Sequence, residues 1–365
     1  MSPPHPPRPD ATEWLRLCLV PGVSAEAQRA LLRQFGSPSE ALDATPQAIA
    51  SVVGLAAAGA LKRGPDSGSI DATLAWLDEE GNRILALGDP DYPATLLQIP
   101  DPPTILFAMG RLELLRSPAL AIVGSRNASH QGIADAHAFA RALSDAGLCV
   151  VSGLAIGIDA AAHRGGLAGA SASIAVVGTG LDRVYPARNR ELALRLSEHG
   201  ALVSEFALGT APTPSNFPRR NRLISGLARG VLVIEAALKS GSLTTARMAL
   251  EQGRDVFALP GSIHSPLSKG CHALIKQGAK LVESAEDVLV ELGLDKPTQL
   301  RDRAPSVPDD PLISALGHAP ASLDSLCERT GQCAQALASR LTEFELAGVV
   351  ERLPGGLFRR LARDA

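Results

Sequence analysis

Residues 119–126 read ALAIVGSR, and residues 148–159 read LCVVSGLAIGID. In each segment a short apolar run rich in β-formers ends in a turn of small and polar residues. Helical patterns such as Gly132–Ala146 and Leu243–Gln252 separate such runs, which is the alternation of right-handed βαβ units. These residues predict an open parallel α/β sheet. The seven expected strands are Ala119–Val123, Leu148–Val151, Ile174–Val177, Ala201–Ser204, Val231–Ile234, Asp255–Leu259 and Lys280–Val282.

The turns after these strands indicate what the sheet binds. In an open parallel sheet the carboxyl ends of the strands lie along one edge, and such folds bind ligands there. Glycine lets a backbone approach a ligand closely, and serine and arginine side chains can contact phosphate. We therefore expect a crevice for a polyanion at this edge. Because turns also contain glycine for steric reasons alone, Gly124-Ser125-Arg126 carries little weight by itself.

The chain of 365 residues is too long for one compact core. Helical patterns precede the sheet, and the last stretch reads as helix, helix, turn, helix and hairpin, which is typical of a winged helix. Thr104–Met109 is expected to add a strand. The expected parts are a disordered leader (1–9), an all-helical domain (10–88), the α/β domain (89–294), a linker (295–311) and a winged-helix-like domain (312–365). The helical domain is expected to be of SAM-like or helix-hairpin-helix type, or to have a packing role only.

Composition argues against several classes of protein. No apolar stretch approaches the roughly 18 residues of a membrane span. Met1–Pro9 contains five prolines and no apolar core, so it does not resemble a signal peptide. The five cysteines are scattered and never form a Cys-x-x-Cys pair, which disfavours a zinc ribbon or a disulfide scaffold and favours the cytoplasm.

Charge is distributed unevenly along the chain. The net charge is only −3, although dedicated nucleic-acid domains are usually strongly basic. Residues 206–234, however, contain no acid and four arginines, which is compatible with anion binding at one site. Residues 306–365 hold six basic and eight acidic side chains. We therefore expect the winged helix to have a structural or protein-contact role rather than to read DNA.

Asn216–Leu227, which reads NFPRRNRLISGL, is the most informative basic segment. Its arginines arrive around the start of a helix, and Phe217 offers a face on which a base could stack. The ordinary alternative is a solvated basic helix start. The residues expected to bind nucleic acid, in this segment and in the turns, are Gly124, Ser125, Arg126, Ser152, Gly153, Asn216, Phe217, Arg219, Arg220, Asn221, Arg222 and Ser242.

Two other turns have the composition of phosphate sites. The turn at Ser152 and Gly153 resembles those that offer free N–H groups at a helix N-terminus. Ser242 lies in the segment SGSLTTA, where it would contact phosphate or cap a helix. No G-x-x-x-x-G-K-[ST] motif occurs, and residues 178–183 carry Arg183 where a dinucleotide fingerprint needs its third glycine. No cofactor is therefore expected.

A catalytic set is hard to assemble from this sequence. Asp159 and His163 lie four residues apart on an expected helix, and Glu205 and Glu235 end expected strands. A capping aspartate and a surface histidine are the commoner explanation for the first pair. No metalloprotease, nucleophile-elbow or clustered metal-ligand motif occurs, so we expect neither an enzyme nor a metal site.

Taken together, the motifs resemble those of the DNA-processing protein A (DprA/Smf) family. The resemblance spans roughly residues 90–290, and the helical and winged-helix flanks also occur in that family. The segments that carry it are Val123–Arg126, Ser152–Asp159, Phe217–Leu227, Glu235-Ala236, Ser240–Ala246 and Gly253–Gly261.

The resemblance implies an extended Rossmann-like domain that binds single-stranded DNA without catalysis. It further implies protection of incoming DNA during natural transformation, loading of the RecA recombinase, and a homodimer formed through this domain. Arg126 would contact phosphate, and the family's Phe-Pro-x-Arg-Asn-Arg segment would carry over to residues 217–222, with Phe217, Arg219, Arg220, Asn221 and Arg222 as its site residues.

Two other functions remain open at this stage. One is a nucleotide-processing enzyme, such as a nucleoside-monophosphate glycosidase on a related Rossmann-like fold, with Glu205 or Glu235 as acid or base. The other is a transcription regulator acting through the winged helix, which its acidic balance disfavours.

Overall fold

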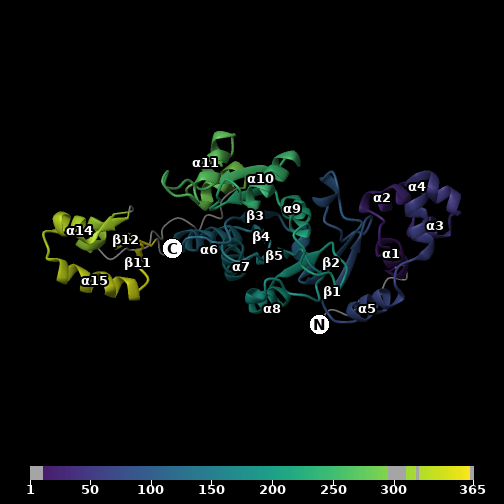
Figure 1. Cartoon of the computed structure of the whole chain (residues 1–365), viewed down its shortest axis with the longest axis horizontal. Coiled ribbons are helices and arrows are strands. Elements are labelled where there is room, and N and C mark those ends of the chain that lie inside the picture. Colours follow the sequence, from purple (N-terminus) through teal and green to yellow (C-terminus); the bar gives the residue numbers. More distant parts are fainter. Residues whose placement is uncertain (1–10, 295–309, 318–319, 362–365) are drawn as a thin grey trace.

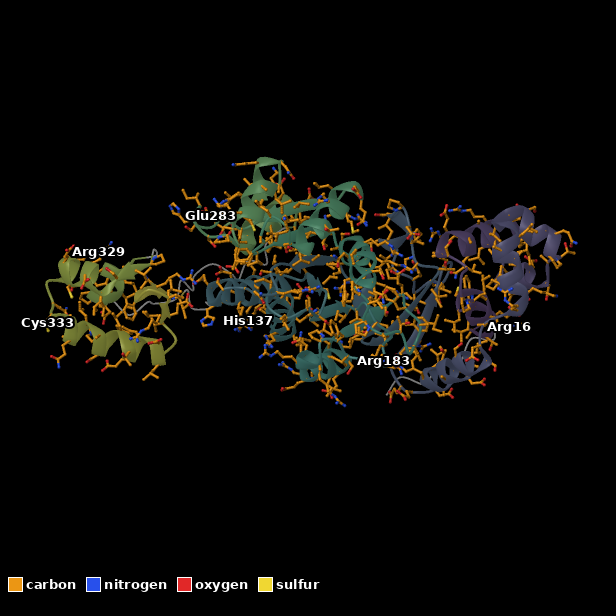
Figure 2. The ribbon with its side chains drawn as sticks, viewed as in Figure 1. Arg16, His137, Arg183, Glu283, Arg329 and Cys333 are labelled. Carbon is orange, nitrogen blue, oxygen red and sulfur yellow. The ribbon has the colours of Figure 1, made fainter. Side chains whose placement is uncertain are left out.

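The computed structural model describes residues 11–294, 310–317 and 320–361. The expected leader and most of the expected linker lie outside these residues. Helices of the N-terminal part and the winged helix lie at opposite ends of a central sheet domain (Figure 1). No described helix combines the length and the apolar character needed to cross a membrane.

The N-terminal part is a cluster of helices whose starts follow local capping rules. Ser24, Ser37, Thr45 and Asp66 each accept a hydrogen bond from a backbone N–H of the first turn of the helix that they precede. The helices are α1 (Ala11–Cys18), α2 (Ala25–Phe35), α3 (Pro38–Asp43), α4 (Pro46–Arg63, bent at Gly54) and α5 (Ser67–Leu77).

The expectation that residues 10–88 are entirely helical is wrong for Asn82–Ala86. These residues form strand β1, which pairs antiparallel with β2 (Ile105–Gly110) in the central sheet. The strand is only five residues long and ends shortly before Gly88 and a proline-rich connection, and its apolar residues are too few to show a period. Strand β2 confirms the extra strand expected at Thr104–Met109.

The central sheet has nine strands in the order β1-β2-β6-β5-β4-β3-β7-β8-β9. All neighbours from β6 to β9 pair parallel, whereas β2 pairs antiparallel with both β1 and β6. All seven expected strands are present within one or two residues. They are β3 (Ala119–Val123), β4 (Cys149–Ser152), β5 (Ser173–Val176), β6 (Ala201–Ser204), β7 (Gly230–Val233), β8 (Asp255–Ala258) and β9 (Lys280–Leu281).

Helices cover both faces of this sheet, which is why its central strands are apolar throughout. Residues alternate between faces: Ala119 and Ala121 of β3 belong to one buried cluster and Leu120 and Ile122 to another. Helices α9 (Asn216–Leu227), α10 (Gly241–Glu251) and α11 (Lys269–Lys276) pack on the first face. Helices α6 (His130–Asp145), α7 (Ile158–Ala168), α8 (Arg190–His199) and α12 (Ala285–Glu291) pack on the second.

The strand order creates a topological switch point at the carboxyl edge of the sheet. From β3 the chain proceeds to β4, β5 and β6 on one side, and it then crosses to β7, β8 and β9 on the other. The connections after β3 and β7 therefore lead to helices on opposite faces of the sheet, α6 and α10, as at the topological switch point of doubly wound sheets. The expected edge and its turns are confirmed.

The C-terminal part is a winged helix, as the sequence predicts. Asp310 caps its first helix, so the helix starts at Pro311 and the expected linker extends no further than residue 309. Three helices pack around one buried cluster beside a three-stranded sheet. The elements are α13 (Pro311–Leu316), β10 (Ala321–Ser322), α14 (Leu323–Thr330), α15 (Ala334–Leu346), β11 (Val350–Leu353) and β12 (Leu357–Arg360).

Candidate functional site

Three loops meet at the switch point of the sheet. Gly157, before α7, has a positive φ of 79°, and a Cβ there would lie 2.4 Å from the carbonyl oxygen of Ser125. A Cβ on Gly124 would lie 2.9 Å from the carbonyl oxygen of Glu235, after β7. Glycine is thus required at both positions because the backbones of the three loops touch. The close packing fixes the turn that carries Arg126.

Arg126 and two aromatic side chains form a stacked group beside this turn. The guanidinium of Arg126 lies 5.6 Å from the centre of the Phe217 ring, within the range of a cation–π contact. Tyr185 lies on Phe217 with ring centres also 5.6 Å apart and is 46% exposed. Phe217 in turn packs over Gly178, where a Cβ would lie 3.2 Å from the ring. The group presents the exposed guanidinium of Arg126 and the exposed ring of Tyr185 beside the half-buried ring of Phe217.

Arg219 extends this accessible surface along α9. Its side chain is 50% exposed, its guanidinium lies 5.3 Å from the centre of the Phe206 ring, and its Nη2 lies 3.1 Å from Oε2 of Glu205. The carboxylate of Glu205 itself is only 2% exposed. Burial raises the pKa of Glu205, and the neighbouring Arg222 and Arg219 oppose that rise.

Arg222, by contrast, is turned into the protein. Its side chain is 11% exposed, and it pairs with Glu205 at 2.6 Å and with Asp101 at 3.1 Å. Asp101 also receives a hydrogen bond from Arg29 of α2. Arg222 therefore belongs to a chain of charges that joins the N-terminal helices to α9, and it offers little surface to a ligand.

Arg220 is buried even more completely. Its Nη1 donates to the carbonyl oxygens of Gly153, at 2.7 Å, and Val176. Burial lowers the pKa of Arg220 to about 10, and Asp159 opposes that shift. Burial also raises the pKa of Asp159, against the effect of Arg220 and two backbone N–H groups. Arg220 thus supports the turn at Gly153 from below.

The N–H groups of the same turn already donate hydrogen bonds to acceptors inside the protein. The amides of Gly153 and Ala155 donate to Asp159 Oδ2 at 3.1 and 3.4 Å, and the amide of Leu154 donates to His163 Nε2 at 3.2 Å. Leu154 is one of two described non-glycine residues with a positive φ. Free N–H groups for a phosphate are therefore not available from these three residues.

His163 is not the surface residue that we expected. Its ring is buried, and Ser173 Oγ, which donates to Val150 O, must accept from its Nδ1. This arrangement assigns the hydrogen to Nδ1 and leaves Nε2 to accept from Leu154. Burial, with Arg220 and Arg164, lowers the pKa of His163 to about 3.

The remaining candidates make local structural contacts. Ser152 donates to the carbonyl of Ile122 and is fully buried, and Asn216 donates to the carbonyl of Gly178 at 3.0 Å. Asn221 accepts from Arg220, and the Ser242 hydroxyl lies 2.7 Å from that of Ser240, the N-cap of α10. The capping alternative for this segment applies to Ser240, whose hydroxyl accepts from the N–H of Ser242, whereas Ser242 itself is buried in the first turn of α10.

Both glutamates of the enzyme hypothesis are engaged by neighbouring side chains. Both oxygens of Glu235 accept from Ser129, from its hydroxyl at 2.6 Å and its N–H at 2.9 Å, and this clasp holds the start of α6. Glu205 is buried between arginines. Among the described residues, no group of three potential ligands could hold a metal ion.

Sequence reasoning missed Tyr185 and the supporting roles of Asp159 and His163. Tyr185 is one of only two tyrosines in the chain and follows the 178–183 turn closely, so its rarity was a usable signal. Its stacking on Phe217 and the burial of His163 depend on packing across the sheet, which a local pattern does not contain.

The sheet topology and the added domain define a Rossmann-like α/β protein with a C-terminal winged helix. A family model for DNA recombination-mediator protein A matches residues 83–293, and one for the DprA winged helix domain matches residues 296–356. The chain belongs to the DNA recombination-mediator protein A (DprA/Smf) family. The resemblance inferred from the motifs is confirmed.

Relatives and solved structures agree with this assignment. The chain is 45% identical to Protein Smf of Escherichia coli K12 over 80% of this chain and 81% of that protein. It is 49% identical to DNA processing protein DprA of Streptococcus pneumoniae over 56% of this chain and 72% of that protein. An X-ray structure of DprA from S. pneumoniae superposes with a TM-score of 0.67 at 39% identity, covering 76% of this chain and 95% of that one.

A second solved structure is informative about ligands of the family. DNA processing protein A from Helicobacter pylori, described for its single-stranded DNA binding mode, is similar with a TM-score of 0.52 at 30% identity. The similarity covers 55% of this chain and 92% of that one.

Proposed function

We propose that this protein is a non-enzymatic single-stranded DNA-binding protein. The observation that carries the proposal is the stacked group of Tyr185, Phe217 and Arg126, with Arg219 beside it, at the carboxyl edge of the sheet. Accessible aromatic faces next to cations suit unpaired bases and their phosphates, whereas paired bases in a duplex have no exposed faces to stack. The single-strand binding of the H. pylori relative supports the same ligand.

The burial of other candidates divides their roles within the proposal. Arg126 and Arg219 would contact phosphate, and Phe217 and Tyr185 would stack on bases. Arg220 and Arg222, with their buried partners, would position these residues without touching DNA. The segment Asn216–Leu227 would thus contain both residues that contact DNA and residues that position them.

The cellular role follows from family membership. The proposal includes protection of incoming DNA during natural transformation, loading of the RecA recombinase, a homodimer formed through the Rossmann-like domain, and a cytoplasmic location. The winged helix has a protein-contact or structural role, since Arg340 of α15 pairs with Asp310 and the same helix carries Glu343 and Glu345.

Fluorescence anisotropy with labelled oligothymidine, competed with duplex, tests the proposal. Binding should prefer the single strand and weaken with salt, with a log–log slope of about −0.7 per neutralised phosphate. Arg126→Ala should weaken it. The matched control is Arg141→Ala, an exposed arginine near the far end of α6, which should bind like wild type. Release of free base from nucleoside monophosphates would instead favour the enzyme hypothesis.

A further inference from the structure

A cavity of about 510 Å³ lies between the N-terminal helices and the sheet domain. Its volume falls in the range of sites that hold small molecules or parts of larger ones. It opens beside the same sheet edge, because β6 ends there and antiparallel β2 begins there. The lining residues used below are Ala25 and Gln28 of α2, Asp101 and Thr104 before β2, and Glu205 and Arg219.

Glu205 brings a buried, unpartnered oxygen to this cavity. Its Oε2 accepts from both Arg219, at 3.1 Å, and Arg222, at 2.6 Å. Its Oε1 is buried and has no hydrogen-bond partner among the described residues. Buried polar atoms nearly always have a partner, so this oxygen points to a ligand group that donates.

The charges around Glu205 indicate what kind of donor is missing. Two guanidinium groups already compensate its negative charge, and Asp101 is paired with Arg29 and Arg222. An additional cation would therefore gain little electrostatic attraction from Glu205 and would be repelled by Arg219. A neutral N–H group satisfies Oε1 without adding charge.

Arg219 joins this cavity to the proposed strand path. It lines the cavity and also lies in the exposed row that starts at Arg126 and Phe217. A phosphate held by Arg219 would therefore place the attached nucleotide at the cavity mouth. A base is the neutral group with N–H donors that a bound strand brings there.

We propose that the cavity takes one base of the bound strand and that Glu205 Oε1 accepts a hydrogen bond from its exocyclic amino group. The proposal rests on the single-strand function above and adds a preference at one position. Cytosine, adenine and guanine carry such an amino group. Thymine and uracil offer only N3–H between two carbonyl oxygens, which the carboxylate repels.

The test compares oligothymidines that carry one central dC or one central dU. These two bases lack the methyl group of thymine and differ only at C4 and N3: cytosine has the amino group beside an acceptor nitrogen, and uracil has a carbonyl oxygen beside N3–H. Anisotropy with wild-type protein should show about tenfold tighter binding of the dC strand, as for a hydrogen bond to a charged group.

Two substitutions assign the preference to the cavity. In Glu205→Gln the amide oxygen can face the arginines, which turns the amide N–H₂ into the cavity, so the preference for dC should disappear or reverse. Asp101→Asn is the matched control: it also removes a carboxylate from Arg222, but both of its oxygens are already engaged, so the preference should remain. Ala25→Trp, which fills the cavity from the first residue of α2, should abolish the preference and keep oligothymidine binding.

The outcomes separate this inference from the proposed function. Tight, salt-dependent binding of both strands with equal affinity would overturn the base site and leave the function standing. A preference that survives both Glu205→Gln and Ala25→Trp would also overturn it. Failure to bind any single strand would remove both proposals.

Discussion

The guanidinium of Arg126 lies over the Phe217 ring, 5.6 Å from its centre, although the two residues belong to different elements at the sheet edge. The contact joins the turn after β3 to the first turn of α9. It places a phosphate-seeking cation and a base-stacking face at one point, which is the arrangement on which the proposed function depends.

The aromatic faces predict a measurable stacking contribution. Tyr185→Ala should weaken oligothymidine binding by about 1–3 kcal/mol, because a base loses its stacking partner. Tyr185→Phe keeps the ring and should bind within about twofold of wild type. Anisotropy titrations of both variants test this, and equal affinities for Tyr185→Ala and Tyr185→Phe would remove stacking from the account.

The adjacent arginines 219 and 220 should behave in opposite ways. Arg220→Met should lower the free energy of unfolding by about 2–5 kcal/mol, because it leaves two buried carbonyl oxygens without their donor and removes the positive charge near the buried Asp159. Arg219→Ala should lower stability less than Arg220→Met does, because the Arg219 side chain is half exposed and the buried Glu205 keeps its ion pair with Arg222, yet it should weaken DNA binding. Urea unfolding and anisotropy on both variants test these roles. An Arg220→Met variant that is as stable as wild type but fails to bind DNA would mean that Arg220 contacts DNA.

Much of the sheet and its edge could be predicted, because each strand–turn unit is a local pattern. The expected strands match within one or two residues, and Arg126 and Phe217 do lie together. The accessibility of each arginine could not be predicted. In a helix, Arg219 and Arg220 point about 100° apart, and only the position of the sheet beneath α9 decides which one is buried. Strand β1 was missed for a similar reason, since its partner β2 lies across a proline-rich loop.

Acidification should destabilise the fold through His163. Its pKa is about 3 in the folded protein and near 6.5 when unfolded, so between these values the unfolded chain binds more protons. Stability therefore falls as pH falls below 6.5, by about 2–3 kcal/mol at pH 4.5 from this group. The raised pKa of Asp159 acts in the opposite direction.

A substitution isolates the histidine contribution. His163→Gln cannot take up the proton, while Asp159 is present in both proteins. Urea unfolding at pH 7.5 and pH 4.5 should therefore show a smaller loss of stability at the lower pH in the variant than in wild type. Equal losses of stability would mean that His163 titrates normally.

The charge chain from α2 to α9 predicts coupling between the N-terminal helices and the site. Arg29 donates to Asp101 and to the carbonyl of Pro102, and Asp101 in turn pairs with Arg222. Arg29→Met should increase hydrogen exchange both in α2 and at the start of α9. Arg33→Met, an exposed arginine one turn further along α2, is the control and should leave α9 unchanged. Faster exchange confined to α2 would refute the coupling.

The central claim is that a single strand lies on the carboxyl edge of the sheet, across Phe217 and Tyr185. Photo-crosslinking of the full-length protein to oligothymidine that contains 5-iododeoxyuridine, followed by mass spectrometry of the peptides, tests it most directly. The account predicts crosslinks in peptides that contain Tyr185 or Phe217, and their loss when excess unlabelled single strand competes. Crosslinks confined to the winged helix, residues 310–361, would contradict it.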